Sequence, residues 1–314
     1  MSIGDVDIVF GTSPPFFQLV AAACVATLKR KPFIFEVRDI WIDSLYPLGI
    51  VKHKFLLRPL KALEILLYKK ADKVIANSPG IVSFINPYID SDKIKVVPNG
   101  VATDDFLVKR EDARKFRESA NWVEKFIVAY IGNIGVTNDI DSIIDAADKI
   151  KELRNVQFVF FGGGIKADYY KTYCKEACID NVFFFDPVKK MEIPVVLSAA
   201  DICIATLKDS PVLSYPYPNK VFDYMAAGRP TVLAANGVIC EVIKMADGGT
   251  VVPAGDSRRI ADAVIYYVNH PEIADKHGRN ARDYVRKHFE RRNLAAELES
   301  ELACLVSPSE GKRG

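Results

Sequence analysis

The sequence carries almost no net charge, because 42 Lys and Arg residues are balanced by 40 Asp and Glu residues, which leaves +2. A chain so close to neutral has no global field that would gather nucleic acid, so we expect no nucleic-acid partner, and any anionic ligand must be held by a local site. The six cysteines form no Cys-x-x-Cys pair and show no zinc-type spacing. We therefore expect free, buried thiols in a reducing cytoplasm.

Long apolar segments are absent as well. The longest apolar run, residues 16–28, contains Gln18 and is shorter than the ~20 residues that a membrane-spanning helix needs. It follows two prolines and has no basic segment before it, which argues against a signal peptide. The sequence thus predicts a cytoplasmic protein, and its 314 residues are enough for about two domains.

Short apolar runs alternate with helical stretches, a pattern typical of βα units around a parallel sheet. We expect strands at residues 7–10, 32–37, 73–76, 94–97, 126–131, 156–161, 182–185, 202–205, 231–233 and 250–252. The pattern predicts an α/β fold with two doubly wound, Rossmann-like domains. The expected divisions are an N-terminal domain at 1–118, a second domain at 119–290, and a C-terminal helix with a polar tail at 291–314. In such folds, ligands bind in a cleft at the carboxyl ends of the strands.

The most informative segment is Pro-Asn-Lys-Val-Phe-Asp-Tyr-Met-Ala-Ala-Gly-Arg-Pro at 218–230. It predicts a short helix that begins after Pro218 and is closed by Gly228. Lys220 and Asp223 are three residues apart, so they share a face near the N-terminus of that helix. A cation at this positive end is unfavourable unless an anion binds there, so Lys220 points to a bound phosphate. On spacing alone, a solvated lysine and an ordinary first-turn aspartate fit equally well.

This segment resembles the signature of the retaining, nucleotide-sugar-dependent glycosyltransferases of family 4, which have two domains in the GT-B fold. Other motifs are similar and come in the same order: Ala-Asp-Lys-Val-Ile-Ala-Asn-Ser-Pro at 71–79, Val-Val-Pro-Asn-Gly-Val at 96–101, Phe-Gly-Gly-Gly at 161–164 and Ala-Ala-Asp-Ile at 199–202. The resemblance implies a glycosyltransferase whose second domain binds a nucleoside diphosphate sugar, expected to be a UDP-sugar. The first domain would bind a polysaccharide or lipid-linked glycan acceptor of cell-surface glycan biosynthesis.

The resemblance also implies the donor-binding residues, which are Gly132, Asn133, Gly135, Gly162, Gly163, Gly164, Val188, Asn219, Lys220 and Asp223. The amides of loop 132–135 are placed to hold a diphosphate, and the glycines at 162–164 either admit the nucleotide or form a bare turn. Lys220 would neutralise the leaving group, and Asp223 would hold the ribose hydroxyls. Asn133 and Asn138 stand where family members commonly carry Arg or Lys, and Tyr215 replaces the first acidic residue of the family motif.

In the first domain, Arg38 and Asp39 end the strand at 32–37, and the resemblance gives both a catalytic position near the donor sugar. A buried structural arrangement of Arg38 and Asp39 is the alternative. Three Asp-x-Asp triplets, at 5–7, 90–92 and 139–141, do not stand at strand ends, so we expect no metal and no cofactor beyond the nucleotide sugar.

Residues 51–70 carry six Lys and Arg against one acidic residue, Glu64, with leucines at helical spacing. Either this helix is attracted to the inner membrane surface, or its leucines pack in the core and its charged face lies in water.

The family's first strands have no counterpart before residue 7, so we expect an incomplete N-terminal sheet with an exposed apolar edge. That expectation leaves a degenerate, non-catalytic nucleotide-sugar-binding protein or fragment as the alternative. A UDP-sugar 2-epimerase of the same fold is disfavoured, because its acids and histidines have no evident counterparts.

Overall fold

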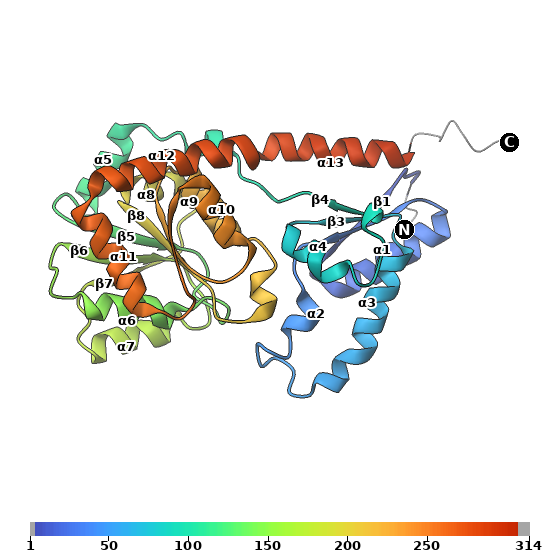
Figure 1. The fold of residues 1–314 in the computed structure, drawn as a ribbon, viewed down its shortest axis with the longest axis horizontal. Helices are drawn as coiled ribbons and strands as arrows, with labels where there is room; N and C mark the ends of the chain where they lie inside the picture. The colour runs from blue at the N-terminus through green and yellow to red at the C-terminus, as the bar shows by residue number, and fades with distance from the viewer. Residues whose placement is uncertain (1–3, 307–314) are drawn as a thin grey trace. The chain divides into compact units, whose positions relative to one another are not determined.

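The computed structural model describes residues 4–306, which divide into two compact units (Figure 1). Within the described residues, the first unit contains 4–99, 214–217 and 292–306, and the second contains 100–213 and 218–291. Each unit has one sheet, and all described strand pairs are parallel, as predicted. All ten predicted strands are present, with ends that differ by no more than three residues.

The first sheet has four strands in the order β1-β2-β3-β4: β1 (Val9–Ser13), β2 (Phe33–Val37), β3 (Lys73–Ala76) and β4 (Ile94–Val96). Because this order never reverses, right-handed crossovers place the connecting helices on one face. The main helices there are α1 (Phe16–Lys29), α3 (Arg58–Lys70) and α4 (Pro79–Ile85), with α2 (Trp41–Ser44) and a 3-10 turn at Lys54–Leu57 between them. Their apolar side chains share one core with Phe33, Phe35 and Val37.

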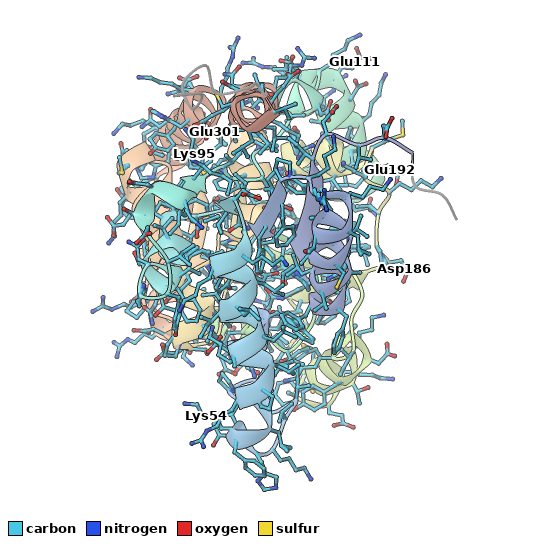
Figure 2. All side chains as sticks on the ribbon, turned by 90° about the vertical axis from the view of Figure 1, so that its right-hand side faces the viewer. Lys54, Lys95, Glu111, Asp186, Glu192 and Glu301 are labelled. Carbon is cyan, nitrogen blue, oxygen red and sulfur yellow. The ribbon has the colours of Figure 1, made fainter. Side chains whose placement is uncertain are left out.

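The opposite face of this sheet is covered by α13 (Arg291–Val306). Ile34 and Ile75 point toward α13 and meet Leu294 and three further leucines of the helix. At the rim, Lys95 pairs with Glu297 at 2.8 Å and with Glu301 at 3.1 Å, and Figure 2 shows Lys95 and Glu301 side by side. The predicted C-terminal helix therefore completes the first unit.

The second sheet has the order β10-β9-β8-β5-β6-β7. Its strands are β5 (Phe126–Ile131), β6 (Val156–Phe161), β7 (Val182–Phe185), β8 (Ile202–Thr206), β9 (Thr231–Ala234) and β10 (Gly249–Val252). Its helices are α5 (Arg110–Ser119), α6 (Ile140–Lys149), α7 (Ala167–Glu176), α8 (Ile193–Ala199), α9 (Asn219–Ala226), α10 (Val238–Ala246), α11 (Ser257–Asn269) and α12 (Pro271–His288). Because the strand order reverses between β5 and β8, a crevice opens at the carboxyl ends of these strands.

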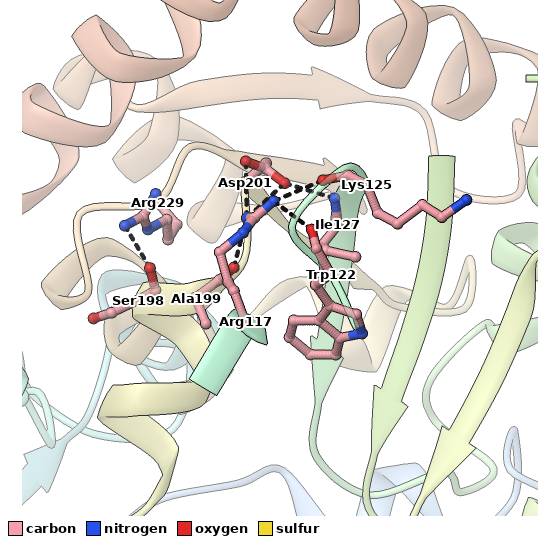
Figure 3. Close-up of polar contacts among 8 residues, drawn as sticks. All are labelled: Arg117, Trp122, Lys125, Ile127, Ser198, Ala199, Asp201 and Arg229. Atoms are coloured by element: carbon pink, nitrogen blue, oxygen red, sulfur yellow. Dashed lines mark hydrogen bonds and ion pairs between the residues drawn. The ribbon is translucent and has the colours of Figure 1, made fainter. Parts of the chain in front are cut away.

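Helix α5 belongs to the second unit because of Arg117 (Figure 3). Its guanidinium donates to the carbonyl of Ala199 at 2.8 Å and contacts the carboxylate of Asp201 at 3.1 Å. It also donates to the carbonyls of Trp122 and Lys125. These contacts hold α5 against the second sheet, so the observed division at residue 99 precedes the expected one at 118.

All six cysteines are free, as expected. The expectation that all are buried is wrong for Cys24, Cys178 and Cys304, which stand on helix surfaces or at a helix end and are exposed. Among residues 4–306, no helix combines the length and the apolar character that a membrane span requires.

Candidate functional site

Two glycine-containing loops meet at the carboxyl ends of β5 and β6. Residues 132–135 follow β5, and residues 162–164 follow β6. The Gly132 N–H donates to the Phe161 carbonyl at 3.0 Å, and the Ile134 N–H donates to the Gly163 carbonyl at 2.8 Å. These bonds consume two of the amides that the sequence offered to a diphosphate. Within residues 4–306, the Asn133 and Gly135 amides have no protein partner, so they are the ones left for a ligand.

Glycine is required at this meeting point. A β-carbon on Gly162 would stand 1.9 Å from the Gly132 carbonyl oxygen, and one on Gly164 would stand 2.4 Å from the Ile134 carbonyl oxygen. Both residues also have positive φ values, 158° and 150°. The glycines at 162 and 164 are thus explained by loop packing, while Gly163 has room around it.

A cavity of about 250 Å³ opens beside these loops. Its lining includes Gly132, Asn133, Gly162, Gly163 and Val188, which the sequence analysis named as donor-binding. Ile193 at the start of α8 also lines it. The structure therefore brings five predicted residues, from three segments far apart in the sequence, around one space.

Lys220 lies on α9 next to this cavity. A β-carbon on Gly132 would stand 3.2 Å from the Lys220 Nζ atom, so the ammonium borders the glycine loop. Nζ donates to the Asn138 Oδ1 atom at 2.7 Å and to the Tyr130 hydroxyl at 2.8 Å. Both partners are neutral, and no carboxylate among the described residues forms an ion pair with Lys220. Loop 132–135 and Lys220, which the sequence analysis assigned to the same diphosphate, therefore lie next to each other.

The charge on Lys220 is poorly compensated. Burial lowers the pKa of this lysine from 10.5 to about 7, because an ammonium that loses water without gaining an anion is destabilised. Hydrogen bonds to a hydroxyl and an amide restore only part of the lost solvation. A bound anion would restore the rest, so the electrostatics of this corner favour an anionic ligand.

Asn138 lies just before α6 but does not cap it. The residue that precedes the helix is Asp139, and it makes no side-chain cap. The buried Asn138 side chain instead donates to the Asn133 carbonyl at 3.0 Å and accepts from Lys220. It ties loop 132–135 to Lys220. Tyr130 does the same through its hydroxyl, which donates to the Asn133 carbonyl at 2.7 Å, and no sequence motif signalled that role.

Asp223 lines a second cavity, of about 320 Å³. Ile193 lines both cavities, so they are neighbours. Burial raises the pKa of Asp223 to about 6, although Arg291 and Lys190 act to lower it. Both basic residues line the same cavity. The space can thus hold a polar molecule between a carboxylate and two cations.

The other predicted residues are not among those that line these two cavities. Asn219 is exposed at the start of α9, and Gly135 packs against the Asn133 side chain. Arg38 and Asp39 follow β2 in the first unit and are both exposed, which argues against a buried structural pair. Tyr215 belongs to the first unit, where its carbonyl accepts from the Ser78 hydroxyl at 2.5 Å. No cluster of three or more His, Cys, Asp and Glu side chains that could hold a metal occurs within residues 4–306.

Comparison with protein families gives the class of the chain. Residues 112–284 match the family described as "Glycosyl transferases group 1", and residues 2–105 match "Glycosyltransferase Family 4". The first match covers more than half of the chain, so the chain belongs to the group 1 glycosyl transferases. This confirms the resemblance to family 4 glycosyltransferases.

Individual relatives are distant. The chain is 25% identical to the "Probable glycosyltransferase WbjE" of Pseudomonas aeruginosa over 263 residues, which are 82% of this chain and 64% of WbjE. It is 21% identical to the "Putative colanic acid biosynthesis glycosyl transferase WcaI" of Escherichia coli (strain K12) over 307 residues, 94% of this chain and 74% of that protein. The chain thus spans less than two thirds of the length of WbjE and about three quarters of the length of WcaI.

Solved structures share the fold. Anabaena Alr3699/HepE, solved in complex with UDP-glucose, has a TM-score of 0.79 at 19% identity, over 95% of this chain and 79% of that one. The sucrose-phosphate synthase of Thermosynechococcus elongatus has a TM-score of 0.77 at 17% identity, over 96% and 74% of the two chains. These likenesses confirm the predicted GT-B fold class.

Proposed function

We propose that this protein is a glycosyltransferase that transfers a sugar from a UDP-sugar to a polysaccharide or lipid-linked glycan acceptor in cell-surface glycan biosynthesis. The observation that carries the proposal is the half-buried Lys220 ammonium, which borders the glycine loop and a cavity and has no carboxylate partner among residues 4–306. The UDP and UDP-glucose complexes of the HepE structure support UDP as the carrier. The name of WcaI supports a surface polysaccharide as the product.

In the proposed reaction, the bond between the sugar C1 atom and the diphosphate oxygen breaks, and the acceptor oxygen forms a new bond to C1. The acceptor hydroxyl releases its proton to the solvent, and negative charge develops on the departing UDP. Lys220 and the free amides of Asn133 and Gly135 would stabilise that charge, since preorganised donors act strongly in a water-poor site. Asp223 would accept hydrogen bonds from the ribose hydroxyls, and Arg38 and Asp39 would act on the sugar.

We further propose that the protein works at the inner membrane surface through residues 50–58. The leucines of α3 pack into the core, with Leu67 buried there. Lys61 forms ion pairs with Asp43 and Glu64. Most of α3 is therefore not free to contact lipid. The preceding turn differs: Phe55 is 61% exposed and stands among exposed basic residues (Figure 2 labels Lys54 at this end). The exposed basic residues of this turn are Lys52, Lys54 and Arg58. Apolar side chains amid cations are what an anionic bilayer surface attracts.

The proposal is tested by heat unfolding with a panel of UDP, UDP-sugars, GDP and ADP, followed by an assay of UDP release. A ligand at one hundred times its Kd stabilises the native state by about 2.7 kcal/mol. We expect UDP compounds to protect the protein from heat unfolding. We also expect slow release of UDP from a UDP-sugar when acceptor membranes are present. Protection without release would favour the non-catalytic binding protein, and no protection by any nucleotide would contradict both.

A further inference from the structure

Strands β5 and β8 are neighbours in the second sheet, but their pairing ends before the strands do. Their register pairs join residues 128–129 of β5 to residues 202–203 of β8, whereas β5 continues to Ile131. The next amide, that of Gly132, donates to Phe161 at the end of β6. Since alternate residues of a strand bond to the same neighbour, the N–H and C=O groups of Ile131 face β8. Among residues 4–306, no strand pairs with them on that side.

The hydroxyl of Tyr224 takes the place of a strand at this point. The Ile131 N–H donates to the Tyr224 Oη atom at 2.9 Å, and the Tyr224 hydroxyl donates to the Ile131 carbonyl at 2.9 Å. A hydroxyl is both a donor and an acceptor, so it satisfies both backbone groups of this residue. The Tyr224 side chain is 1% exposed, and burial raises the pKa of its hydroxyl well above the usual range, so the hydroxyl keeps its proton.

This contact lies at the base of the proposed donor site. Ile131 directly precedes loop 132–135 and lines the cavity of about 250 Å³. Tyr224 follows Asp223 on α9 and comes one turn after Lys220. Tyr224 itself is not among the residues that line either cavity. The two hydrogen bonds therefore join the loop, from the protein interior, to the helix that carries Lys220.

The bonds that Lys220 makes itself do not fix the position of α9. Its ammonium contacts Tyr130 and Asn138 from the end of a flexible four-carbon chain, which adapts to several positions of the helix. The side chain of Tyr224 has two rotatable bonds and a rigid ring, so its length is nearly constant. Groups that bind one ligand together must be held within about 0.5 Å of the productive geometry, and Tyr224 supplies that constraint.

We propose that Tyr224 is a positioning residue of the nucleotide-sugar site: its hydroxyl holds α9 at the distance from loop 132–135 at which Lys220 and the loop amides bind one diphosphate. The inference rests on the proposed function, because it requires a diphosphate between these groups. Removal of the hydroxyl leaves the N–H and C=O groups of Ile131 unpaired in the interior, and the loop and α9 shift until water or other groups satisfy them. Lys220 and the loop then no longer meet the diphosphate together.

The test measures UDP affinity by calorimetry for Tyr224→Phe in two backgrounds, the wild type and Lys220→Met. In the wild type, we expect Tyr224→Phe to weaken UDP binding by roughly tenfold to a hundredfold, the range for one hydrogen bond to a charged group. In Lys220→Met, the same substitution should weaken it by less than about threefold, because the ammonium that Tyr224 positions is gone. The same loss in both backgrounds would indicate a merely structural role and would overturn the proposal.

Tyr267→Phe is the matched control. Tyr267 is a buried tyrosine of the same unit whose hydroxyl accepts from Thr250 and bonds to His277, and it is not among the residues that line either cavity. Its substitution also removes two hydrogen bonds from the interior, but the UDP affinity should stay within about twofold of the wild type. A loss as large as that of Tyr224→Phe would show that the effect is not specific to α9 and would overturn the proposal.

Hydrogen exchange of the wild type without nucleotide gives a reading that does not depend on a variant folding. The Ile131 amide should exchange as slowly as the other buried amides of β5, and fast exchange there would overturn the proposal. A wild type that binds no UDP would overturn the proposed function and this inference with it. A wild type that binds UDP, with a Tyr224→Phe chain that binds it equally well, would overturn this inference alone.

Discussion

Lys220 and Gly132 come from segments that are 88 positions apart in the sequence, yet the Lys220 Nζ atom would stand 3.2 Å from a β-carbon on Gly132. Only hydrogen occupies that position, so the ammonium reaches the backbone of the loop. Asn138 and Tyr130 hold it there without supplying charge. The resulting corner has a cation, amide donors and a neighbouring cavity, and within the described part of the chain no carboxylate pairs with the cation.

The pKa of Lys220 predicts that ligand binding takes up a proton. In the free protein this pKa is about 7, so most of the ammonium has lost its proton at pH 8. A bound diphosphate favours the charged form and raises the pKa, so the affinity for UDP-glucose should fall by up to about tenfold per pH unit above 7. Calorimetry at pH 8 in buffers of different ionisation enthalpy should report uptake of close to one proton.

Lys220→Arg is the control for this prediction, because a guanidinium stays charged throughout this range. Its affinity for UDP-glucose should not change between pH 7 and 9. A wild type whose binding enthalpy is independent of the buffer would show that Lys220 is already charged, or that it does not meet the diphosphate.

Asp223 is predicted to hold the ribose. Asp223→Ala should weaken UDP binding by roughly tenfold to a hundredfold, because hydrogen bonds to a charged group contribute about 1.5–3 kcal/mol. The same substitution should not affect the binding of 2′,3′-dideoxy-UDP, which lacks the hydroxyls. Asp186→Ala, which removes an exposed carboxylate of the same unit, should leave both affinities unchanged. Equal losses for UDP and its dideoxy analogue would assign Asp223 a different role.

The glycine loops allow a matched pair of substitutions. Gly162→Ala should reduce the free energy of unfolding by more than ~1 kcal/mol and weaken UDP binding, because the new β-carbon meets the Gly132 carbonyl oxygen at a positive φ. Gly163→Ala meets nothing closer than 3.5 Å and should change stability by less than about 0.5 kcal/mol. Urea unfolding measures both. A stable Gly162→Ala chain with normal affinity would refute the packing argument.

Membrane contact through residues 50–58 is tested with sedimenting vesicles that contain phosphatidylserine. Each basic residue near an anionic surface contributes about 1 kcal/mol, so Lys52→Glu combined with Lys54→Glu should weaken vesicle binding by roughly thirtyfold or more. Lys149→Glu combined with Lys175→Glu reverses two exposed charges in the second unit and should have little effect. Equal effects of the two pairs would indicate that only net charge matters.

The strands were predictable because each is a short apolar run bounded by polar residues, and a buried parallel strand needs nothing more specific. The closeness of loop 132–135 to Lys220 followed from the motifs. The network through Tyr130 and Asn138 did not, since it depends on side chains that meet only when β5, α6 and α9 pack together. The role of α13 was missed for the same reason: its leucines show that it packs, but not on which sheet.

The central claim is that the diphosphate of a nucleotide sugar neutralises the charge of Lys220. The affinity of the Lys220→Met variant for UDP tests this claim most directly. Methionine has a similar length and no charge. It removes an ammonium that has lost water without gaining an ion pair, which offsets the loss of the hydrogen bonds to Asn138 and Tyr130, so the variant should fold. Calorimetry should show a loss of about a hundredfold or more in UDP affinity. A loss of less than threefold, in a folded variant, would contradict the account.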